Sequence, residues 1–424
     1  MLDIKLIRDK RDEVEKALLK RVAKDVLNLG GIIALDDNRK EILIGLEALK
    51  AERNKNSKVK PTPEIIEQMK KIGEEVKELE ANLRNVEDQL KEKLSELPNI
   101  PAEDVLPGGK ENNKVVKTFG EKPEFSFEPI DHVELAKRMD LIDYDRGVKI
   151  AGSGFWCYRG NGALLEWALL NYFKDFHVAN GYTFILPPFL LNEDSAYASG
   201  HLPKFRDDLF WTSRSSENKQ GDSLCLNATS EMMINNLHRN EVLDEIDLPL
   251  KYFAYSPCFR KEPGGYGAGE KGTTRGHQFN KIEMFQFTRP EDSWSGFEEL
   301  VGNAEKLVEG LGLHYQTVQL AAQDASASMS KTCDIEVWIP SMNTYKEVSS
   351  ASNAIDYQAR RADIKYKSSK TGKNEFVHTL NASGLATSRL LPAILEQFQQ
   401  EDGSVRIPEV LHKYMNGVKE IKSK

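Results

Sequence analysis

Residues 251–287 read KYFAYSPCFRKEPGGYGAGEKGTTRGHQFNKIEMFQF, in which two strand-like runs flank a glycine-rich link. The link holds a Gly-x-Gly-x-x-Gly pattern at Gly267, Gly269 and Gly272, and in a dinucleotide-binding loop this pattern precedes a helix. Residues 275–287 instead alternate in the manner of a strand. The stretch therefore predicts a long antiparallel hairpin rather than a dinucleotide-binding loop.

One face of this hairpin combines charged and aromatic side chains, because alternate positions of a strand point the same way. Arginines can grip a triphosphate, an aromatic ring can stack on a purine, and carboxylates can hold an amine. The alternative is an ordinary charged sheet face with one exposed aromatic residue. The residues on this face are Arg260 and Glu262 on the first strand, and Arg275, His277, Phe279, Lys281 and Glu283 on the second.

Two polar clusters further along the chain are candidates for metal and phosphate binding. Residues 346–353, KEVSSASN, offer a carboxylate and hydroxyls that could bind Mg²⁺ while phosphate oxygens remain bound to the same ion. A polar stretch of this kind is also typical of a loop. Residues 381–389, NASGLATSR, are predicted to open a helix that runs to about Gln399 and is kinked at Pro392. Arg389 then lies near the positive helix end, which suits anion binding; surface solvation is the alternative.

The N-terminal region has a different periodicity, with apolar residues in 4-3 spacing and charged residues between them. A shorter register of the same kind covers residues 35–49, and the polar, proline-containing stretch 54–63 cannot continue a helix. Two helices joined by a turn predict an antiparallel coiled-coil hairpin that projects as an arm. A phosphate-binding tip competes here with a solvated coiled coil or a dimerisation rod. The seam residues are Ile65, Met69, Ile72, Val76, Leu79, Leu83, Val86 and Leu90, and the basic residues near the tip are Lys50, Arg53, Lys55, Lys58 and Lys60.

The remaining chain predicts the fold class and the domain boundary. Residues 97–125 are rich in proline, glycine and charge, which is typical of a linker. Beyond them a helical pattern over 164–176 leads into 181–189, a strand ended by two prolines, and later strand-like runs are interleaved with helical stretches. This order predicts an α+β fold with a mostly antiparallel sheet flanked by helices. We expect an N-terminal helical domain over 1–108 and a second domain over 109–424.

The composition of the chain argues against several functional classes. The 424 residues are 40% hydrophobic and 29% charged, which allows one large core and a second unit. No run approaches the roughly 18 apolar residues of a membrane helix and the start lacks an apolar signal core, so a cytoplasmic protein without a membrane anchor is expected. The four cysteines form no Cys-x-x-Cys pair, which argues against a disulfide framework or a structural zinc. A net charge of -8 argues only weakly against nucleic-acid binding, because a local basic surface suffices.

Taken together, these stretches resemble seryl-tRNA synthetases from the first residues to about Tyr414. Residues 181–189 resemble the first class II motif, residues 259–283 the second and residues 378–389 the third. Their order, with residues 331–338 and a coiled-coil arm in front, is specific to the seryl branch. The resemblance implies a class II sheet and activation of L-serine with ATP and Mg²⁺. It further implies transfer of serine to the 3′ end of tRNA-Ser by a homodimer, with tRNA-Sec as a second candidate substrate.

The resemblance also implies roles position by position. Arg260 would hold the α-phosphate, and catalysis by Arg260, Arg389 and the metal would be positioning and charge neutralisation, because serine's own carboxylate attacks. The serine-binding residues would be Thr229, Ser230, Glu231, Arg260, Glu283, Asn381 and Ser383. The ATP-binding residues would be Arg260, Lys261, Glu262, Arg275, Gly276, Phe279, Glu347, Val348, Ser349, Ser350 and Arg389, with Glu347 and Ser350 as Mg²⁺ ligands. The tRNA-binding residues would be Lys50, Arg53, Lys55, Lys58 and Lys60 of the arm.

Two other functional classes compete with this interpretation. A related protein that passes serine to a carrier protein or small molecule would lack the arm, and a non-catalytic RNA-binding protein would lack Arg260, Glu283 or Arg389; the chain has the arm and all three residues. Departures from the family pattern remove no charged or hydroxyl group with an assigned role, so catalysis should survive. These departures are Gly154, Met232, Met233, Pro263, Gly276 and Pro392.

Overall fold

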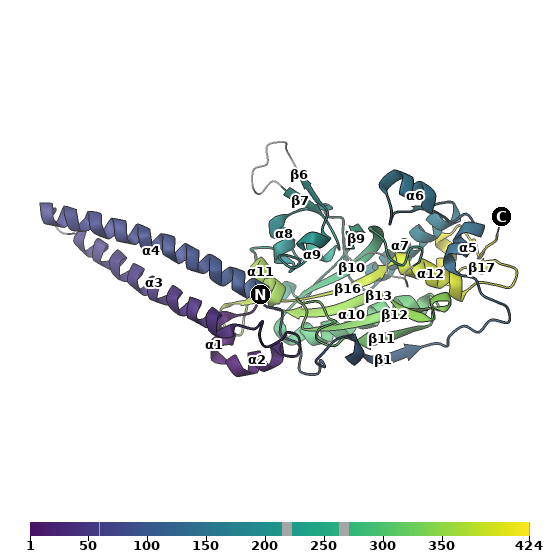
Figure 1. Cartoon of the computed structure of the whole chain (residues 1–424), viewed down its shortest axis with the longest axis horizontal. Helices are drawn as coiled ribbons and strands as arrows, with labels where there is room; N and C mark the ends of the chain where they lie inside the picture. The colour runs from purple at the N-terminus through teal and green to yellow at the C-terminus, as the bar shows by residue number, and fades with distance from the viewer. Residues whose placement is uncertain (59, 214–222, 263–270, 424) are drawn as a thin grey trace. The chain divides into compact units, whose positions relative to one another are not determined.

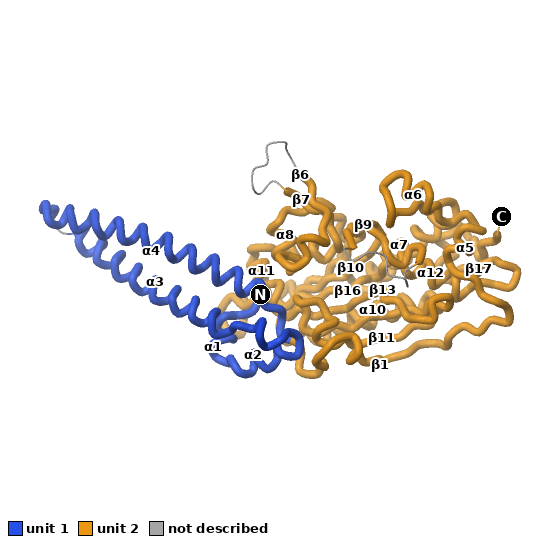
Figure 2. The backbone as a smooth tube through the Cα atoms, in the orientation of Figure 1, with its two compact units in different colours: residues 1–100 blue, residues 101–424 orange. Residues whose placement is uncertain are grey.

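The computed structural model describes residues 1–58, 60–213, 223–262 and 271–423. The chain divides into two compact units, Met1–Ile100 and Pro101–Lys424 (Figure 2). This division falls before the expected boundary between residues 108 and 109. Most of the glycine-rich link after Glu262 lies outside the described residues. Within the described parts of the chain, no helix has the length and apolar character needed to span a bilayer.

The first unit is dominated by an antiparallel pair of long helices, α3 and α4 (Figure 1). The Thr62 hydroxyl accepts a hydrogen bond from the Ile65 amide and Pro63 takes the first turn, so α4 begins with a satisfied cap. Leu46, Ile72 and Val76 are buried in the seam, which confirms the predicted helical hairpin. The predicted break at residue 54 is wrong, because α3 continues through Asn56. The helices are α1 (Ile4–Asp9), α2 (Arg11–Leu18), α3 (Leu29–Asn56) and α4 (Pro63–Glu96).

The second unit is built on an eight-stranded sheet in the order β1-β11-β12-β13-β16-β10-β9-β4 (Figure 1). Its neighbouring strands pair antiparallel except for β4, which pairs parallel with β9. The predicted fold class is therefore confirmed. The strands are β1 (Lys114–Phe119), β4 (Thr183–Ile185), β9 (Leu250–Phe259), β10 (Gln278–Thr288), β11 (Tyr315–Gln319), β12 (Lys331–Ile339), β13 (Thr344–Ile355) and β16 (His378–Ala386).

Helices α7, α10 and α12 cover one face of this sheet with an apolar layer. Phe173, Leu300 and Ile394 from these helices share one core with Ile282 and Met284 of β10. The helices of the unit are α5 (His132–Arg138), α6 (Tyr144–Ala151), α7 (Asn161–Ala179), α8 (Glu193–Ala198), α9 (Glu231–Ile234), α10 (Ser293–Gly310), α11 (Tyr357–Ala362) and α12 (Thr387–Gln397). Its short strands are β2 (Ile142–Asp143), β3 (Cys157–Tyr158), β5 (Leu190–Asn192), β6 (Trp211–Ser213), β7 (Ser223–Leu226), β8 (Val242–Asp244), β14 (Lys365–Lys367), β15 (Asn374–Phe376), β17 (Val405–Arg406) and β18 (Glu420–Ile421).

The hairpin predicted from residues 251–287 is present as β9 and β10, in antiparallel register. Its second strand begins at Gln278, so the expectation that Arg275 and His277 lie in the strand is wrong. Arg260 and Glu262, which the alternation places on the first strand, both lie beyond the end of β9, and Glu262 has a left-handed conformation with φ of 46°. The pairing of the two strands therefore ends at Phe259 and Gln278, before the glycine-rich link. The predicted alternation of side chains holds only from Phe279 onward.

The two polar clusters are strands, which corrects two further predictions. Residues 346–353 belong to β13 rather than to a loop, and residues 381–386 belong to β16, so that α12 starts only at Thr387. Hydroxyls in these strands are satisfied by neighbouring strands: Ser349 Oγ donates to the Ser383 carbonyl at 2.6 Å, and Ser352 Oγ lies 2.9 Å from Thr332 Oγ1. Small polar residues can therefore occupy a central strand without loss of hydrogen bonds.

Candidate active site

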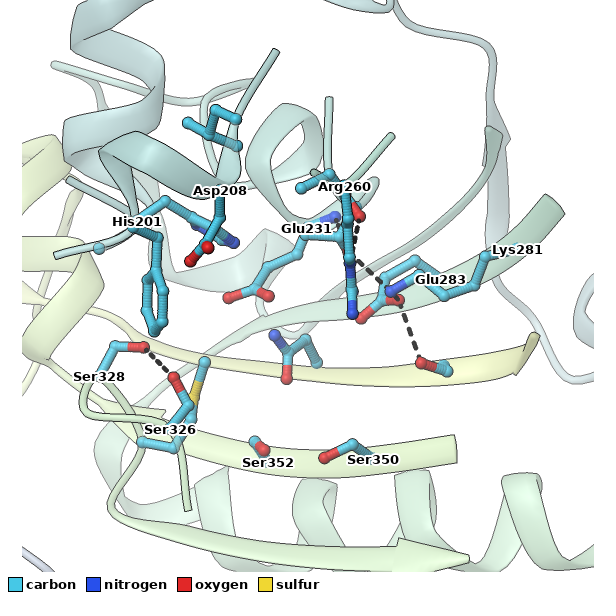
Figure 3. A pocket seen from close by; sticks show the side chains of 18 of the residues that line it. His201, Asp208, Glu231, Arg260, Lys281, Glu283, Ser326, Ser328, Ser350 and Ser352 are labelled. Atoms are coloured by element: carbon cyan, nitrogen blue, oxygen red, sulfur yellow. Dashed lines mark hydrogen bonds and ion pairs between the residues drawn. The ribbon is translucent and has the colours of Figure 1, made fainter. Parts of the chain in front are cut away.

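A cavity of about 450 Å³ lies over β10, β13 and β16, on the sheet face away from the α7, α10 and α12 layer (Figure 3). It is lined by Gly200, His201, Phe205, Asp208, Leu209, Ala228, Thr229, Glu231, Arg260, Glu262, Arg275, Lys281, Glu283, Ser326, Ser328, Met329, Glu347, Ser350, Ser352, Asn381 and Ser383. A recess of about 70 Å³ adjoins it and adds Thr274, Gly276, Phe279, Ala386, Ser388 and Arg389. The residues that line both spaces are Arg260, Glu262, Arg275, Lys281, Glu347 and Ser383.

Strand alternation explains why β10 supplies both core and cavity residues. Ile282 and Met284 point into the apolar core, whereas Lys281 and Glu283 line the cavity and Phe279 lines the recess. The prediction that Phe279, Lys281 and Glu283 share one face of the strand is therefore confirmed. Register then brings β16 beside them, since Ser383 lies opposite Glu283.

Glu231 and Glu283 are the buried carboxylates of the cavity. Gln358 Nε2 donates to Glu231 Oε1 at 2.6 Å, and Thr379 Oγ1 donates to Gln358 Oε1 at 2.7 Å, which orients the amide. Burial raises the pKa of Glu231 to about 7, and the Glu283 charge adds to the rise, while the Gln358 hydrogen bond and nearby cations oppose it. Two carboxylates in a buried pocket suit a cationic amine.

Lys281 connects Glu283 to Thr229 across the pocket. Its ammonium forms an ion pair with the Glu283 carboxylate and donates to Thr229 Oγ1 at 2.7 Å. Ser383 Oγ approaches the same Glu283 carboxylate at 3.5 Å. Because Lys281 and Glu283 are both buried, their opposite charges balance where neither could be left alone.

Three guanidinium groups surround the recess. The Arg260 guanidinium lies 5.3 Å from the centre of the Phe279 ring, and its Nε donates to the Ala228 carbonyl at 3.3 Å. Arg275 Nη2 lies 2.8 Å from Glu262 Oε2. Arg389, in the first turn of α12, donates to the Glu347 carbonyl at 2.8 Å. Planar cations around an aromatic ring suit a nucleotide with its phosphates.

Glu347 and Ser350 form an oxygen-rich corner on β13. Asp334 of β12 lies opposite Ser350, and its buried Oδ1 has no hydrogen-bond partner among the described residues. Burial and the nearby Glu347 charge raise the pKa of Asp334 well above its usual value. Two carboxylates, one of them with a partnerless oxygen, and a hydroxyl are donors that fit a hard divalent cation.

Not every residue expected in the site presents its side chain to the cavity. Ser230 Oγ is buried 2.8 Å from Ser256 Oγ, Val348 lies in the apolar core, and Ser349 bonds β16. These residues can reach a ligand only through the backbone. Lys261 is exposed and outside the lining of both spaces. In the first unit, Lys50 Nζ pairs with Glu80 Oε1 at 2.8 Å, and the other basic residues are exposed, namely Arg53, Lys55, Lys58 and Lys60.

Several lining residues carry no local sequence signal. His201, Asp208 and Ser326 come from segments far from the hairpin and fit no motif. Burial, together with neighbouring positive charges, lowers the pKa of His201 to about 3, so its imidazole is neutral at physiological pH. Lys281 lies between Phe279 and Glu283 on the alternating face that the sequence predicts, but neither the pattern nor the resemblance assigned it a binding role. The glycine at position 276, a departure from the family pattern, is explained by packing, because a Cβ there would lie 2.1 Å from the Trp156 ring.

An antiparallel sheet whose open face carries this two-part cavity is the architecture of a class II aminoacyl-tRNA synthetase. Residues 210–398 match the family model described as the tRNA synthetase class II core domain (G, H, P, S and T). Residues 1–101 match the model described as the seryl-tRNA synthetase N-terminal domain. The class II core match lies within the second compact unit, and the N-terminal match covers the first.

Comparison with individual proteins identifies the branch of this class to which the chain belongs. The chain is 54% identical to serine–tRNA ligase 2 of Clostridium acetobutylicum, over 98% of this chain and 99% of that protein. It superposes on seryl-tRNA synthetase from Pyrococcus horikoshii complexed with ATP, with a TM-score of 0.92, 34% identity and full coverage of both chains. A cytoplasmic serine–tRNA ligase from Naegleria fowleri in complex with AMP gives a TM-score of 0.88 and 32% identity, over 100% and 99% of the two chains. The chain belongs to the seryl-tRNA synthetase family.

Proposed function

We propose that this chain is a serine–tRNA ligase, which activates L-serine with ATP to seryl-adenylate and then esterifies serine to the 3′ end of tRNA-Ser. Arg260 carries the proposal, because it lines both the cavity with the buried carboxylates and the recess with Phe279 and Arg389. A group at this junction can hold the atoms that join an amino acid to a nucleotide. The ATP and AMP complexes of the solved relatives support ATP as the substrate, and tRNA-Sec is a second candidate acceptor.

The chemistry needs no protein nucleophile, because serine's carboxylate attacks the α-phosphate in line and pyrophosphate leaves. Arg260 neutralises the charge that develops there, while Arg275 and Arg389 hold the outer phosphates. Phe279 stacks on adenine, and Glu262 accepts a hydrogen bond from its amino group. In the second step a hydroxyl of the terminal ribose attacks the carbonyl carbon of the adenylate, and AMP leaves.

Mg²⁺ belongs to the same proposal. Glu347 and Ser350 would hold it, and it would supply positive charge beside the phosphate oxygens. The oxygen donors of this corner and the partnerless Asp334 Oδ1 fit such an ion.

Serine would be contacted by the side chains of Thr229, Glu231, Glu283, Asn381 and Ser383, and by the backbone of Ser230.

Serine-dependent ATP-pyrophosphate exchange tests the first half-reaction, and charging of tRNA-Ser tests the second. Both activities are expected. No exchange would overturn the proposed function. Exchange without charging would favour the alternative in which serine passes to a carrier protein or small molecule.

Serine use is expected to weaken in acid because Glu231 must be ionised to hold the serine ammonium. Its raised pKa of about 7 means that the carboxyl becomes neutral as the pH falls through that value. From pH 8 to pH 6, kcat/KM for serine should drop about tenfold, while kcat/KM for ATP changes less. Exchange kinetics across this range measure the effect. Glu231→Gln should bind serine weakly with a flat profile; an unchanged profile in this variant would show that another group titrates.

An exposed apolar surface supports a homodimer. Trp167 and Val178 of α7 are 56% and 55% exposed, and Leu186, just beyond β4, is 70% exposed. Helix α7 and strand β4 contact each other, so these side chains belong to one part of the unit. A surface of this kind is typical of an interface between subunits.

The double variant Trp167→Glu/Leu186→Glu is expected to sediment as a monomer, because two charges would have to be buried in the interface. Analytical ultracentrifugation of the full chain measures this. Ile246→Glu is the control, since Ile246 is 91% exposed and lies in the 3-10 helix η3 (Glu245–Asp247). A double variant that remains dimeric would place the interface elsewhere.

The division of labour between the two regions is also part of the proposal. Residues 1–108 would bind the tRNA through the basic tip of the arm, and residues 109–424 would carry both chemical steps. A cytoplasmic location follows from the substrate, because translation uses the charged tRNA there.

A further inference from the structure

Thr229 has an unusual hydrogen-bond arrangement at the wall of the cavity. Its Oγ1 accepts from Lys281 Nζ at 2.7 Å and from the Glu231 amide at 3.2 Å. A hydroxyl oxygen has two acceptor positions and one hydrogen to donate. Both acceptor positions of Thr229 are therefore occupied by groups that can only donate.

The direction of these bonds cannot be reversed. An ammonium has three donors and no acceptor, and a backbone amide is likewise a donor only. Lys281 is buried and is anchored at the same time by the Glu283 carboxylate. The Thr229 hydroxyl therefore has its hydrogen left over, and within the described residues it donates to no protein acceptor. Because Thr229 lines the cavity, that hydrogen is available to a ligand.

We propose that Lys281 is a positioning residue that fixes the polarity of the Thr229 hydroxyl, so that Thr229 donates to an oxygen of serine and cannot accept from the serine ammonium. The inference rests on the proposed function, which supplies serine as the ligand. The ammonium is then left to the carboxylates Glu231 and Glu283. Two serine oxygens have the required acceptor chemistry, those of the carboxylate and that of the side-chain hydroxyl.

A purely local role for Lys281 makes a different prediction. If Lys281 only balanced the Glu283 charge, its effect on serine binding would be independent of Thr229. If it acts through Thr229, removal of either group removes the same contact, and the two effects do not multiply.

The test compares Thr229→Val, Lys281→Met and the double variant in serine-dependent pyrophosphate exchange by the full-length enzyme. Each single variant is expected to raise the KM for serine about 10–100-fold with the KM for ATP within about twofold. The double variant should lie within about threefold of Lys281→Met. Thr229→Ser keeps the hydroxyl and Lys281→Arg keeps a donor, so the first should be close to wild type and the second should recover part of the loss.

Lys251→Met is the matched control. Lys251 also forms a lysine-carboxylate pair on this sheet, with Nζ 2.6 Å from Glu299 Oε2, but it is outside the lining of the cavity. Its serine KM should stay at the wild-type value. Thermal melting of every variant separates loss of the site from loss of the fold, and Thr229→Val, which is nearly isosteric, keeps the test informative if Lys281→Met does not fold.

Two analogues identify the oxygen that receives the hydrogen bond. Serinol lacks the carboxylate and alanine lacks the side-chain hydroxyl, and each is used as a competitive inhibitor of exchange. If Thr229→Val weakens serine and alanine but not serinol, the acceptor is the carboxylate; if it weakens serine and serinol but not alanine, the acceptor is the hydroxyl. Either result supports the proposal.

Three results would overturn it: Thr229→Val with an unchanged serine KM, effects of the two single changes that multiply in the double variant, or equal losses for serine and ATP. Failure of the proposed function is recognised separately, because the wild-type enzyme would then show no serine-dependent exchange at all.

Discussion

Arg260→Ala is expected to lower kcat for serine-dependent ATP-pyrophosphate exchange by about 10²–10³-fold, the usual effect of removing one donor aimed at developing charge. The reason is its position, since Arg260 lines both the cavity and the recess and its guanidinium lies 5.3 Å from the Phe279 ring. Arg260→Lys should recover little, because an ammonium cannot reproduce the planar fork of a guanidinium. Steady-state exchange at saturating serine and ATP measures the loss.

Arg138→Ala is the control for this experiment. Arg138 forms an exposed ion pair with Glu134 on α5, at 2.7 Å, and a surface pair of this kind contributes little. Its kcat should be within about twofold of wild type, and both arginine variants should melt close to the wild-type temperature. An Arg260→Ala enzyme within about tenfold of wild type would contradict the placement of the α-phosphate at the junction.

A shortened arm is expected to keep exchange within about twofold but to lose about 10²-fold or more in kcat/KM for charging tRNA-Ser, because it removes the basic tip that would contact phosphates. The structure suggests replacing residues 46–78 with a short glycine-serine turn. Gly45 and Leu79 face each other across the hairpin, with Leu79 Cδ1 3.7 Å from where a Cβ on Gly45 would lie. The buried residues Val86 and Leu90 at the base of α4 remain.

The charge contribution is separated by neutralising the exposed tip alone. Lys55→Gln/Lys58→Gln/Lys60→Gln in the full-length hairpin should weaken charging less than the shortened arm does. It should also make log(kcat/KM) less dependent on log[salt], since fewer counterions are released on binding. Charging that survives the shortened arm unchanged would refute the tRNA-binding role and leave a solvated coiled coil or a dimerisation rod.

Much of the molecule follows from patterns that act over a few residues. The 4-3 spacing of Ile72 and Val76 predicts a helical seam because each helix repeats its own geometry every few residues, and both are buried in it. The shared face of Phe279, Lys281 and Glu283 follows from strand alternation for the same reason. Local patterns therefore predicted the helical hairpin and part of the strand hairpin, and the resemblance to a known family implied roles for further residues of the lining, but neither indicated His201, Asp208 or Ser326.

Polar strands show where local patterns fail. Residues 346–353 and 381–386 have the composition of loops, yet they form β13 and β16 because hydroxyls such as that of Ser349 find acceptors on the next strand. Which strand lies next to which depends on pairings between residues far apart in sequence. No local spacing contains that information.

The structure of residues 251–287 thus depends partly on local pattern and partly on long-range contacts. Its nature as a strand pair with a charged and aromatic face follows from local pattern alone, because side-chain direction in a strand depends only on whether a position is odd or even. The ion pair of Arg275 with Glu262 outside the ladder, and the hydrogen bond from Lys281 to Thr229, depend instead on the folding of the whole unit. Such contacts join segments that are distant along the chain, and packing, burial and hydrogen bonding of the whole fold select them.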